Sequence, residues 1–280
     1  MEGGELGNTI ITGGDGIIGS YIDFGSRLSR RDLDVTDHAA VENAFHKIKP
    51  NIVIHLAAMT DMEACEREPS RAWEVNALGT FHVASLCRRA SAKMVYISTA
   101  VVFSGEKDSF RETDLPNPAS VYARTKYAGE LIVRDLMPHY LILRTSWVFG
   151  GGPSRDHKFV GKIARALRAH NPVKAATDHV GSPTFAKDFV ERMNELIRQN
   201  REGIFHVVNA GTASRWDMAR EIASCIEPSA KIETASLQDF GITADRASRE
   251  VLTTSETPLR SWQEAIADYL TNEWSSRPSA

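Results

Sequence analysis

The chain has 280 residues, of which 42% are hydrophobic and 25% are charged. This balance is typical of a globular protein that buries a substantial core, and the length suits a large α/β unit or a nucleotide domain with a small lobe. The formal net charge of −3 gives no electrostatic reason to expect nucleic acid or an anionic membrane as the main partner.

Cysteine usage and the N-terminus point to a reducing compartment. Cys65, Cys87 and Cys225 are widely spaced and offer neither a disulfide framework nor the spacing of metal ligands. No apolar run approaches the ~20 residues needed to cross a bilayer, and the acidic N-terminus lacks the features of a signal peptide. We therefore expect a cytoplasmic protein without a bound metal. Its oligomeric state stays open, with a homodimer as the commonest assembly of soluble enzymes.

Short apolar runs alternate with helical patterns through the first half of the chain. Strands are expected at 9–12, 51–56, 93–97 and 140–143, and helices after Asp37, after Pro69 and around 122–134. This alternation predicts a parallel sheet with helices on both faces, which is a doubly wound, Rossmann-type α/β fold.

The rhythm loosens after Gly150, which suggests a second, smaller unit. We expect residues 1–150 to form the NAD(P)-binding domain, completed by segments around 185–225. Residues 151–184 and 226–280 are then mainly a C-terminal substrate-binding lobe. The lobe is expected to contain helical stretches, and its polar region around 227–250 is irregular.

A glycine-rich segment follows the first expected strand. Gly13, Gly16 and Gly19 form a G-x-x-G-x-x-G motif between that strand and a helical pattern. Glycines allow a tight turn and a close approach of a pyrophosphate, and a helix N-terminus offers free N–H groups. The placement favours dinucleotide binding over a merely flexible turn.

The connection after this loop is unusually short. Residues 20–33 must supply both the first helix and the second strand, although such a crossover normally takes at least ~10–12 residues before the strand. We expect a helix of about two turns that ends at Gly25, followed by a stub of strand at 26–29. The adenosine corner of the cofactor site is therefore expected to be cramped.

The same corner contains opposing signals for cofactor choice. Arg27, Arg30 and Arg31 lie where a ribose 2′-phosphate would sit, and a guanidinium suits phosphate, which favours NADP(H) slightly. Asp32 and Asp34 lie where a carboxylate would favour NAD(H). The basic residues could equally form a solvated turn, so the choice between the two coenzymes stays open.

A second constellation carries the chemistry. Tyr122 and Lys126 are four residues apart, which places them on one face of a helix, and Ser98-Thr99 ends the preceding strand. A lysine cation favours ionisation of a phenol whose free pKa is ~10, and the phenol can donate the proton that an alkoxide needs after hydride transfer. The alternative, an ordinary surface pair, loses weight because the glycine loop lies upstream.

Several segments resemble the extended short-chain dehydrogenases, a group within the NAD-dependent epimerase/dehydratase superfamily, and among them the dTDP-4-dehydrorhamnose reductase family. The similarity covers nearly the whole chain. It is carried by segments 34–37 (DVTD), 56–66 (LAAMTDMEACE), 98–105 (STAVVFSG), 143–147 (LRTSW), 181–184 (GSPT) and 261–265 (SWQEA).

The resemblance implies a catalytic trio of Thr99, Tyr122 and Lys126. With the glycine loop, the expected cofactor site comprises Gly13, Gly16, Ile17, Ile18, Gly19, Arg30, Asp34, Val35, Ala57, Ala58, Met59, Thr60, Tyr122 and Lys126. The expected substrate site comprises Thr99, Ala100 and Trp147.

Trp147 has an independent physical argument. An indole face can cover the apolar side of a pyranose while its N–H acts as a donor. The alternative is a core aromatic residue beside Val148 and Phe149.

Two departures from the family pattern keep the function open. Ala100 and Val101 replace an Asp and a Tyr that help to hold the sugar, and the crossover is truncated. The leading hypothesis is an NAD(P)H-dependent reductase of a nucleotide-activated 4-keto-6-deoxysugar, as in dTDP-rhamnose and polysaccharide biosynthesis. The alternatives are an epimerase or dehydratase that retains NAD, and a non-catalytic binding or regulatory protein on the same fold.

Overall fold

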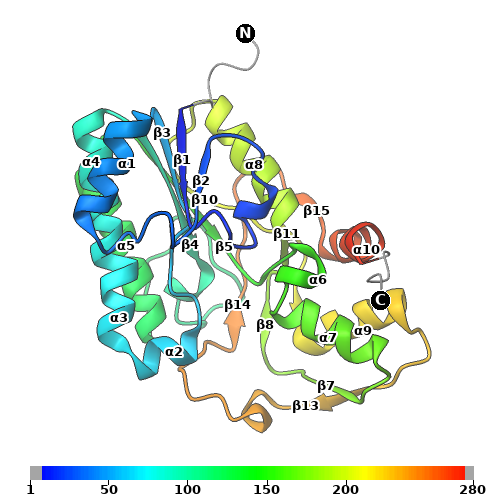
Figure 1. Cartoon of the computed structure of the whole chain (residues 1–280). Helices are drawn as coiled ribbons and strands as arrows, with labels where there is room; N and C mark the ends of the chain where they lie inside the picture. The colour runs from blue at the N-terminus through cyan, green and yellow to red at the C-terminus, as the bar shows by residue number, and fades with distance from the viewer. Residues whose placement is uncertain (1–7, 275–280) are drawn as a thin grey trace.

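The computed structural model describes residues 8–274, and a six-stranded parallel sheet forms the centre of its larger part (Figure 1). In spatial order the strands are β2 (Ser26–Leu28), β1 (Thr9–Thr12), β3 (Ile52–His55), β4 (Lys93–Thr99), β5 (Tyr140–Thr145) and β10 (Gly203–His206). All residues of β1 and β3 are buried, which is expected of a parallel sheet covered on both faces. The expected doubly wound fold is confirmed.

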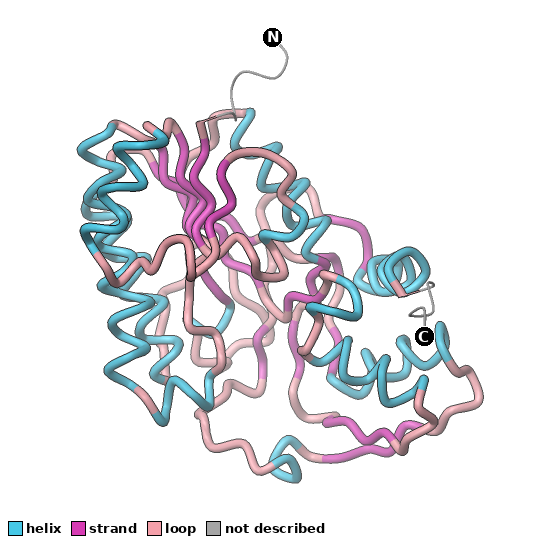
Figure 2. The backbone as a smooth tube through the Cα atoms, viewed as in Figure 1, coloured by secondary structure: helices cyan, strands magenta, loops and turns pink. Residues whose placement is uncertain are grey.

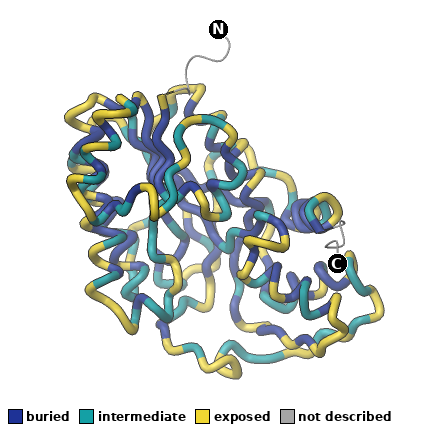
Figure 3. Tube along the Cα trace, in the orientation of Figure 1, coloured by how far each residue is buried: buried dark blue, intermediate teal, exposed yellow. Residues whose placement is uncertain are grey.

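One face of the sheet is covered by α1, α4 and α5 and the other by α8, so the sheet lies between two helical layers (Figures 1 and 2). The helices on the first side are α1 (His38–Ile48), α2 (Met62–Arg67), α3 (Pro69–Trp73), the π-helical turn η2 (Glu74–Leu78), α4 (Gly79–Ala90) and α5 (Val121–Leu136). The second face is covered by α8 (Ala186–Arg198). Figure 3 shows the central strands as the buried part of this domain.

The smaller lobe packs around its own core. Its helices are α6 (Gly152–Arg155), α7 (Phe159–Arg168), α9 (Arg215–Ile226) and α10 (Trp262–Glu273). Short strands connect them: β6 (Val148–Phe149), β7 (Val173–Ala176), β8 (Val180–Gly181), β9 (Thr184–Phe185), β11 (Asn209–Ala210), β12 (Ala213–Ser214), β13 (Ile232–Ala235), β14 (Arg249–Glu250) and β15 (Leu259–Ser261). The 3₁₀ turns within the described residues are η1 (Gly19–Tyr21), η3 (Ala100–Val102) and η4 (Leu237–Phe240).

The packing of helix α9 does not follow the predicted division into domains. Helix α8 and strand β10 join the sheet layer. Helix α9, however, packs against α7 and α10 through Met218 and Ile222. The expected boundary near residue 225 therefore moves back, because the apolar face of α9 is buried in the lobe and not against the sheet.

The truncated crossover forms no α-helix. The expected two-turn helix is wrong: only the 3₁₀ turn η1 follows the glycine loop. The strand stub is correct, with Ser26 paired to Ile10 of β1. Gly25 adopts a φ of 67°, the left-handed region that favours glycine. The buried Ile22 packs in the core beneath α8. Helix α8 and the Ile22 side chain therefore cover the part of the sheet that the expected helix would have covered.

Tyr21, in the same turn, joins the sheet domain to the lobe. Its hydroxyl donates to the carboxylate of Glu273 at 2.7 and 2.8 Å and accepts from the Gly151 N–H at 2.6 Å. Burial and the neighbouring carboxylate raise the pKa of this phenol, which therefore stays protonated. The shortened segment is thus held by tertiary contacts instead of by its own helix.

No helix within residues 8–274 is both long enough and apolar enough to span a membrane. The cysteines within that range are free thiols.

Candidate active site

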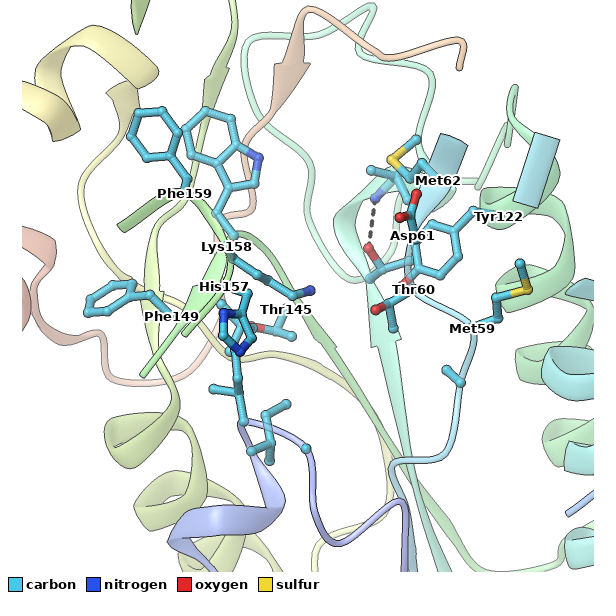
Figure 4. Close-up of a pocket in the computed structure, with 18 of the residues that line it drawn as sticks. Met59, Thr60, Asp61, Met62, Tyr122, Thr145, Phe149, His157, Lys158 and Phe159 are labelled. Atoms are coloured by element: carbon cyan, nitrogen blue, oxygen red, sulfur yellow. Dashed lines mark hydrogen bonds between the residues drawn. The ribbon is translucent and has the colours of Figure 1, made fainter. Parts of the chain in front are cut away.

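A cavity of about 1610 Å³ lies between the sheet domain and the lobe. It begins at the carboxyl ends of β1 and β3, where the strand order reverses, which is the place where open parallel sheets bind ligands. Figure 4 shows its two walls: Tyr122 and the segment 59–62 stand on one side, and Phe149, His157, Lys158 and Phe159 stand on the other.

The glycine loop lines one end of the cavity, and every residue expected there faces it: Gly13, Gly16, Ile17, Ile18 and Gly19. Gly13 has a φ of 66°, and a Cβ atom on it would lie 2.8 Å from the Ala57 nitrogen. Only glycine fits between these two strand ends, which matches a phosphate cradle. A long helix with its dipole is missing behind this cradle, because only η1 follows it.

The adenosine corner is built around Asp34. Its carboxylate lies 3.5 Å from Arg30 and 3.5 Å from Arg71, and it accepts from the Thr36 N–H at 3.0 Å. These hydrogen bonds and the two guanidinium groups lower the pKa of Asp34 despite its partial burial. Arg71 was missed at the sequence level because it comes from α3, far along the chain.

The other arginines of this corner have different surroundings. Arg27 packs over Gly14 and donates to the Gly19 carbonyl at 3.3 Å. Arg31 is exposed and does not line the cavity. Of the three sequence candidates for a phosphate contact, Arg30 alone lines it.

A loop at the end of β3 carries further expected cofactor residues. Ala57, Ala58, Met59 and Thr60 all line the cavity, as does Val35 from the segment between β2 and α1. Asn76 holds this loop in place and was not foreseen: its side chain accepts from the Met59 N–H at 2.8 Å and donates to the Met59 carbonyl at 3.1 Å. It also donates to Thr125 on α5 at 3.0 Å. The π-helical turn points this amide inward and so ties the loop to the helix of the catalytic candidates.

The structure brings Thr99, Tyr122 and Lys126 to one cavity. Thr99 ends β4, and the other two stand in the first turns of α5. The start of α5 is fixed twice: Ser120 accepts from the Ala123 N–H, and Glu66 accepts from the Val121 N–H at 2.7 Å.

Burial sets the electrostatics of this trio. It raises the pKa of Tyr122, while the Thr99 hydroxyl acts in the opposite direction, so the phenol is protonated and available as a donor. Burial lowers the pKa of Lys126 to about 7, with the Glu130 carboxylate opposing that shift. The Lys126 amine lies 4.1 Å from the centre of the Tyr96 ring. With a pKa near neutrality, the protonation of the Lys126 amine is sensitive to a charged ligand that enters the cavity.

Behind the trio, a buried ion pair fixes α5 on the sheet. Arg144 donates to both oxygens of Glu130, at 2.8 and 2.6 Å, and Ser98 donates to the same carboxylate at 2.5 Å. Arg144 and Glu130 are 1% and 0% exposed. A bidentate buried pair is directional, so it sets the position of the helix relative to β4 and β5.

The lobe wall is strongly polar. The Trp147 N–H donates to Glu250 at 2.7 Å, and His179 lies 3.1 Å from the other oxygen of that carboxylate. The Arg215 guanidinium lies 3.5 Å from the centre of the Trp147 ring. The expectation that the indole N–H is free for a sugar is therefore not met, because Glu250 already accepts it.

The two residues that follow Thr99 differ in whether they line the cavity. Val101 lines the cavity but Ala100 does not, because η3 turns its side chain into the core, where it is 2% exposed. Ala100 is thus removed from the expected substrate contacts. Lys158 was not foreseen, and its amine points into the cavity from the lobe (Figure 4).

The segment before β14 crosses to the sheet domain at the far end of the cavity. Glu63 of α2 accepts from the N–H groups of Thr243 and Ala244 and pairs with Arg246 at 3.4 Å. This contact links the cofactor side and the lobe side of the cavity. Within residues 8–274, no group of three His, Cys, Asp or Glu side chains is arranged to hold a metal.

A doubly wound sheet whose switch-point cavity joins a glycine cradle to a Thr, Tyr and Lys set is the architecture of the extended short-chain dehydrogenases, NAD(P)-dependent oxidoreductases. A family model described as the RmlD substrate binding domain matches residues 7–274. The chain therefore belongs to the RmlD family, and the resemblance carried by its motifs is confirmed.

Individual proteins agree with this assignment. A dTDP-4-dehydrorhamnose reductase of Mycobacterium tuberculosis is 33% identical over 288 residues, covering 95% of this chain and 93% of that protein. The spore coat polysaccharide biosynthesis protein SpsK of Bacillus subtilis is 32% identical and covers 87% of each chain. A crystal structure of dTDP-4-dehydrorhamnose reductase from Bacillus anthracis in complex with NADP has a TM-score of 0.89, at 30% identity, and covers 94% of this chain and 98% of that one.

Proposed function

We propose that the protein is an NADPH-dependent reductase that converts a nucleotide-linked 4-keto-6-deoxysugar to the corresponding alcohol. The observation that carries the proposal is the shared cavity. It runs from the glycine cradle past Thr99, Tyr122 and Lys126 to the polar wall of the lobe. The relatives named as dTDP-4-dehydrorhamnose reductases support the substrate class.

The glycine cradle and the loop held by Asn76 fit a nicotinamide dinucleotide, which supplies the hydride when bound. A Cβ atom at Gly13 would collide with the backbone of Ala57, so glycine lets the cradle and this loop approach closely. Arg30 and Arg71 flank Asp34, and Arg71 also pairs with Glu74 at 3.0 Å. Guanidinium groups at this corner suit a 2′-phosphate, so we infer a preference for NADPH, the coenzyme bound in the Bacillus anthracis structure.

Side chains of the protein then carry out the proton transfer. Thr99 donates a hydrogen bond to the ketone oxygen, and Tyr122, protonated at neutral pH, donates its proton to the alkoxide that forms. Lys126, whose pKa burial lowers to about 7, stabilises in its charged form the phenolate left behind. The buried pair of Arg144 and Glu130 fixes α5, which carries Tyr122 and Lys126, relative to Thr99 at the end of β4.

Two lobe cations fit the diphosphate of such a substrate. Lys158 points into the cavity (Figure 4), and Arg215 is stacked on Trp147. Neither side chain has a hydrogen-bond partner among residues 8–274. Two cations that face one cavity attract a ligand with negative charges.

The test is reduction of dTDP-, GDP-, UDP- and CDP-linked 4-keto-6-deoxysugars with NADPH and with NADH, followed by the loss of absorbance of the reduced coenzyme. We expect turnover with a dTDP-linked ketone and NADPH. Failure of every ketosugar with folded protein that binds NADPH would refute the reductase assignment. NAD retained through purification would instead indicate an epimerase or dehydratase.

A further inference from the structure

The η3 turn, which directly follows Thr99, offers no side-chain polar group to a sugar. Ala100, Val101 and Val102 of η3 are 2%, 8% and 0% exposed, and Val101 is the residue among them that lines the cavity. A sugar hydroxyl that leaves water without a partner costs free energy. Recognition of the ring must therefore come from another part of the cavity.

The facing wall contains a buried carboxylate. Glu250 lies on β14, which pairs with β8, and it is 6% exposed. Its two oxygens accept from Trp147 at 2.7 Å and from His179 at 3.1 Å. Because His179 and Arg215 interact with the charged form, the pKa of Glu250 is lowered despite burial, so the group is ionised at neutral pH.

This cluster is only half satisfied. An ionised carboxylate has about four acceptor positions, and the contacts to Trp147 and His179 use two. Since the carboxylate can only accept, Nε2 of His179 carries a proton, which leaves Nδ1 as the second polar atom of the ring. That Nδ1 atom is buried and has no hydrogen-bond partner among the described residues. Buried polar atoms are normally paired, so the free acceptor positions of Glu250 and the Nδ1 atom suit a ligand that forms hydrogen bonds.

The position of the cluster connects it to the reaction. Trp147, His179, Arg215 and Glu250 line the same cavity as Tyr122. The Glu250 charge is close enough to raise the pKa of the Tyr122 phenol. The Arg215 guanidinium, stacked on the Trp147 ring, places a cation beside this acceptor site. Acceptors and a cation side by side match a sugar ring with its adjoining phosphate.

We propose that Glu250 determines sugar specificity: its carboxylate accepts a hydrogen bond from a ring hydroxyl of the keto sugar, at the 2- or 3-position. His179 and Trp147 are positioning residues that hold the carboxylate, and Arg215 binds the phosphate next to the sugar. This inference rests on the proposed function. In this proposal the lobe wall binds the sugar hydroxyl, which the apolar residues beside Thr99 cannot do.

The consequence is discrimination against deoxygenated sugars. A substrate that lacks the hydroxyl leaves an ionised, desolvated carboxylate without its partner, and sites built to bind a hydroxyl reject such analogues strongly. If the cluster only supported the cavity wall, its disruption would weaken the binding of all the sugars equally. The ratio of affinities for hydroxylated and deoxy sugars therefore distinguishes a specificity role from a structural role.

The experiment compares wild type with Glu250→Gln, using dTDP-6-deoxyhexoses that retain or lack the 2- or 3-hydroxyl. Binding is measured by calorimetry with NADP-loaded protein, and kcat/KM is measured for the matching 4-ketones. Gln preserves the size of the side chain, and His179 can change tautomer to accept from the new amide. Arg249→Ala, an exposed change on the same strand, is the matched control.

We expect wild type to prefer one hydroxylated sugar by about 10- to 100-fold over its deoxy analogue. Glu250→Gln reduces that ratio to a few-fold, and Arg249→Ala leaves it unchanged. An equal loss for all sugars in Glu250→Gln, or a wild type that binds these sugars no better than dTDP, would overturn the proposal. If the ketones are not reduced, the proposed function fails, while the calorimetric ratios still decide the role of Glu250.

Discussion

At the catalytic end of the cavity, Thr99, Tyr122 and Lys126 stand on a seven-residue strand and a 16-residue helix. At the adenosine end, the cofactor site rests on a three-residue strand and a 3₁₀ turn. The first end is fixed by a buried ion pair and two helix-start contacts. The second is held by Tyr21 and by the arginines around Asp34.

This difference has a physical reason. Proton transfer needs groups positioned to within a fraction of an ångström, which requires rigid supporting elements. Cofactor affinity is a sum of several separate contacts, so one helix can be lost if other contacts persist. The comparison leads to four predictions, which test each end in turn.

The largest expected effect is at the catalytic end. Tyr122→Phe removes the proton donor and lowers kcat/KM for the ketosugar by about 100- to 10,000-fold, while the calorimetric Kd for NADPH stays within a few-fold. Tyr127→Phe, on the same helix but outside the cavity, is the control and retains activity. Comparable activity of Tyr122→Phe and wild type would show that the phenol is not the donor.

Lys126→Met tests the buried cation through stability. Burial lowers the pKa of Lys126 to about 7 in the folded protein, far below that of the unfolded chain, ~10.4. Between these values the unfolded state binds more protons, so wild-type stability rises with pH, whereas below pH 7 the cost of burying the charge is complete.

Lys126→Met removes this dependence. Its Tm therefore exceeds that of wild type most at pH 6 to 7, and the gap shrinks as the pH rises toward 9.5. Thermal unfolding across this range measures the gap, with the exposed Lys47→Met as control. A gap that grows with pH would contradict the assigned direction of the pKa.

At the adenosine end, Arg71→Ala removes one of the two cations that flank Asp34. We expect the Kd for NADPH to rise about tenfold, the size of one charge-assisted hydrogen bond, while the Kd for NADH hardly changes. Arg31→Ala, an exposed neighbour of this corner, serves as the matched control. Equal weakening for both coenzymes would exclude a contact to the 2′-phosphate.

The smallest effect concerns the replacement for the missing helix. Tyr21→Phe leaves the Gly151 N–H and the Glu273 carboxylate without their shared partner, at a cost of about 1–3 kcal/mol. The free energy of unfolding in urea measures this loss, and Tyr140→Phe is the control. An unchanged free energy of unfolding would mean that the hydrogen bonds from Tyr21 to Gly151 and Glu273 do not stabilise the shortened segment.

Local sequence patterns determined much of this protein. The strand, glycine loop and helix order of the first half depends on apolar periodicity and on turn residues, both of which are local properties. The four-residue spacing of Tyr122 and Lys126 likewise fixed their common helix face. The short length of segment 20–33 indicated a cramped corner, although not that its helix would disappear.

Tertiary structure alone decided which distant residues complete the site. Arg71 reaches Asp34, Asn76 reaches Met59, and Glu250 reaches Trp147 across 103 positions of the chain. No periodicity or motif links such residues, because their meeting depends on how helices and lobe pack and not on local backbone preference. The same reason explains why Trp147 was expected to offer its N–H to a ligand: the acceptor that takes it comes from another strand.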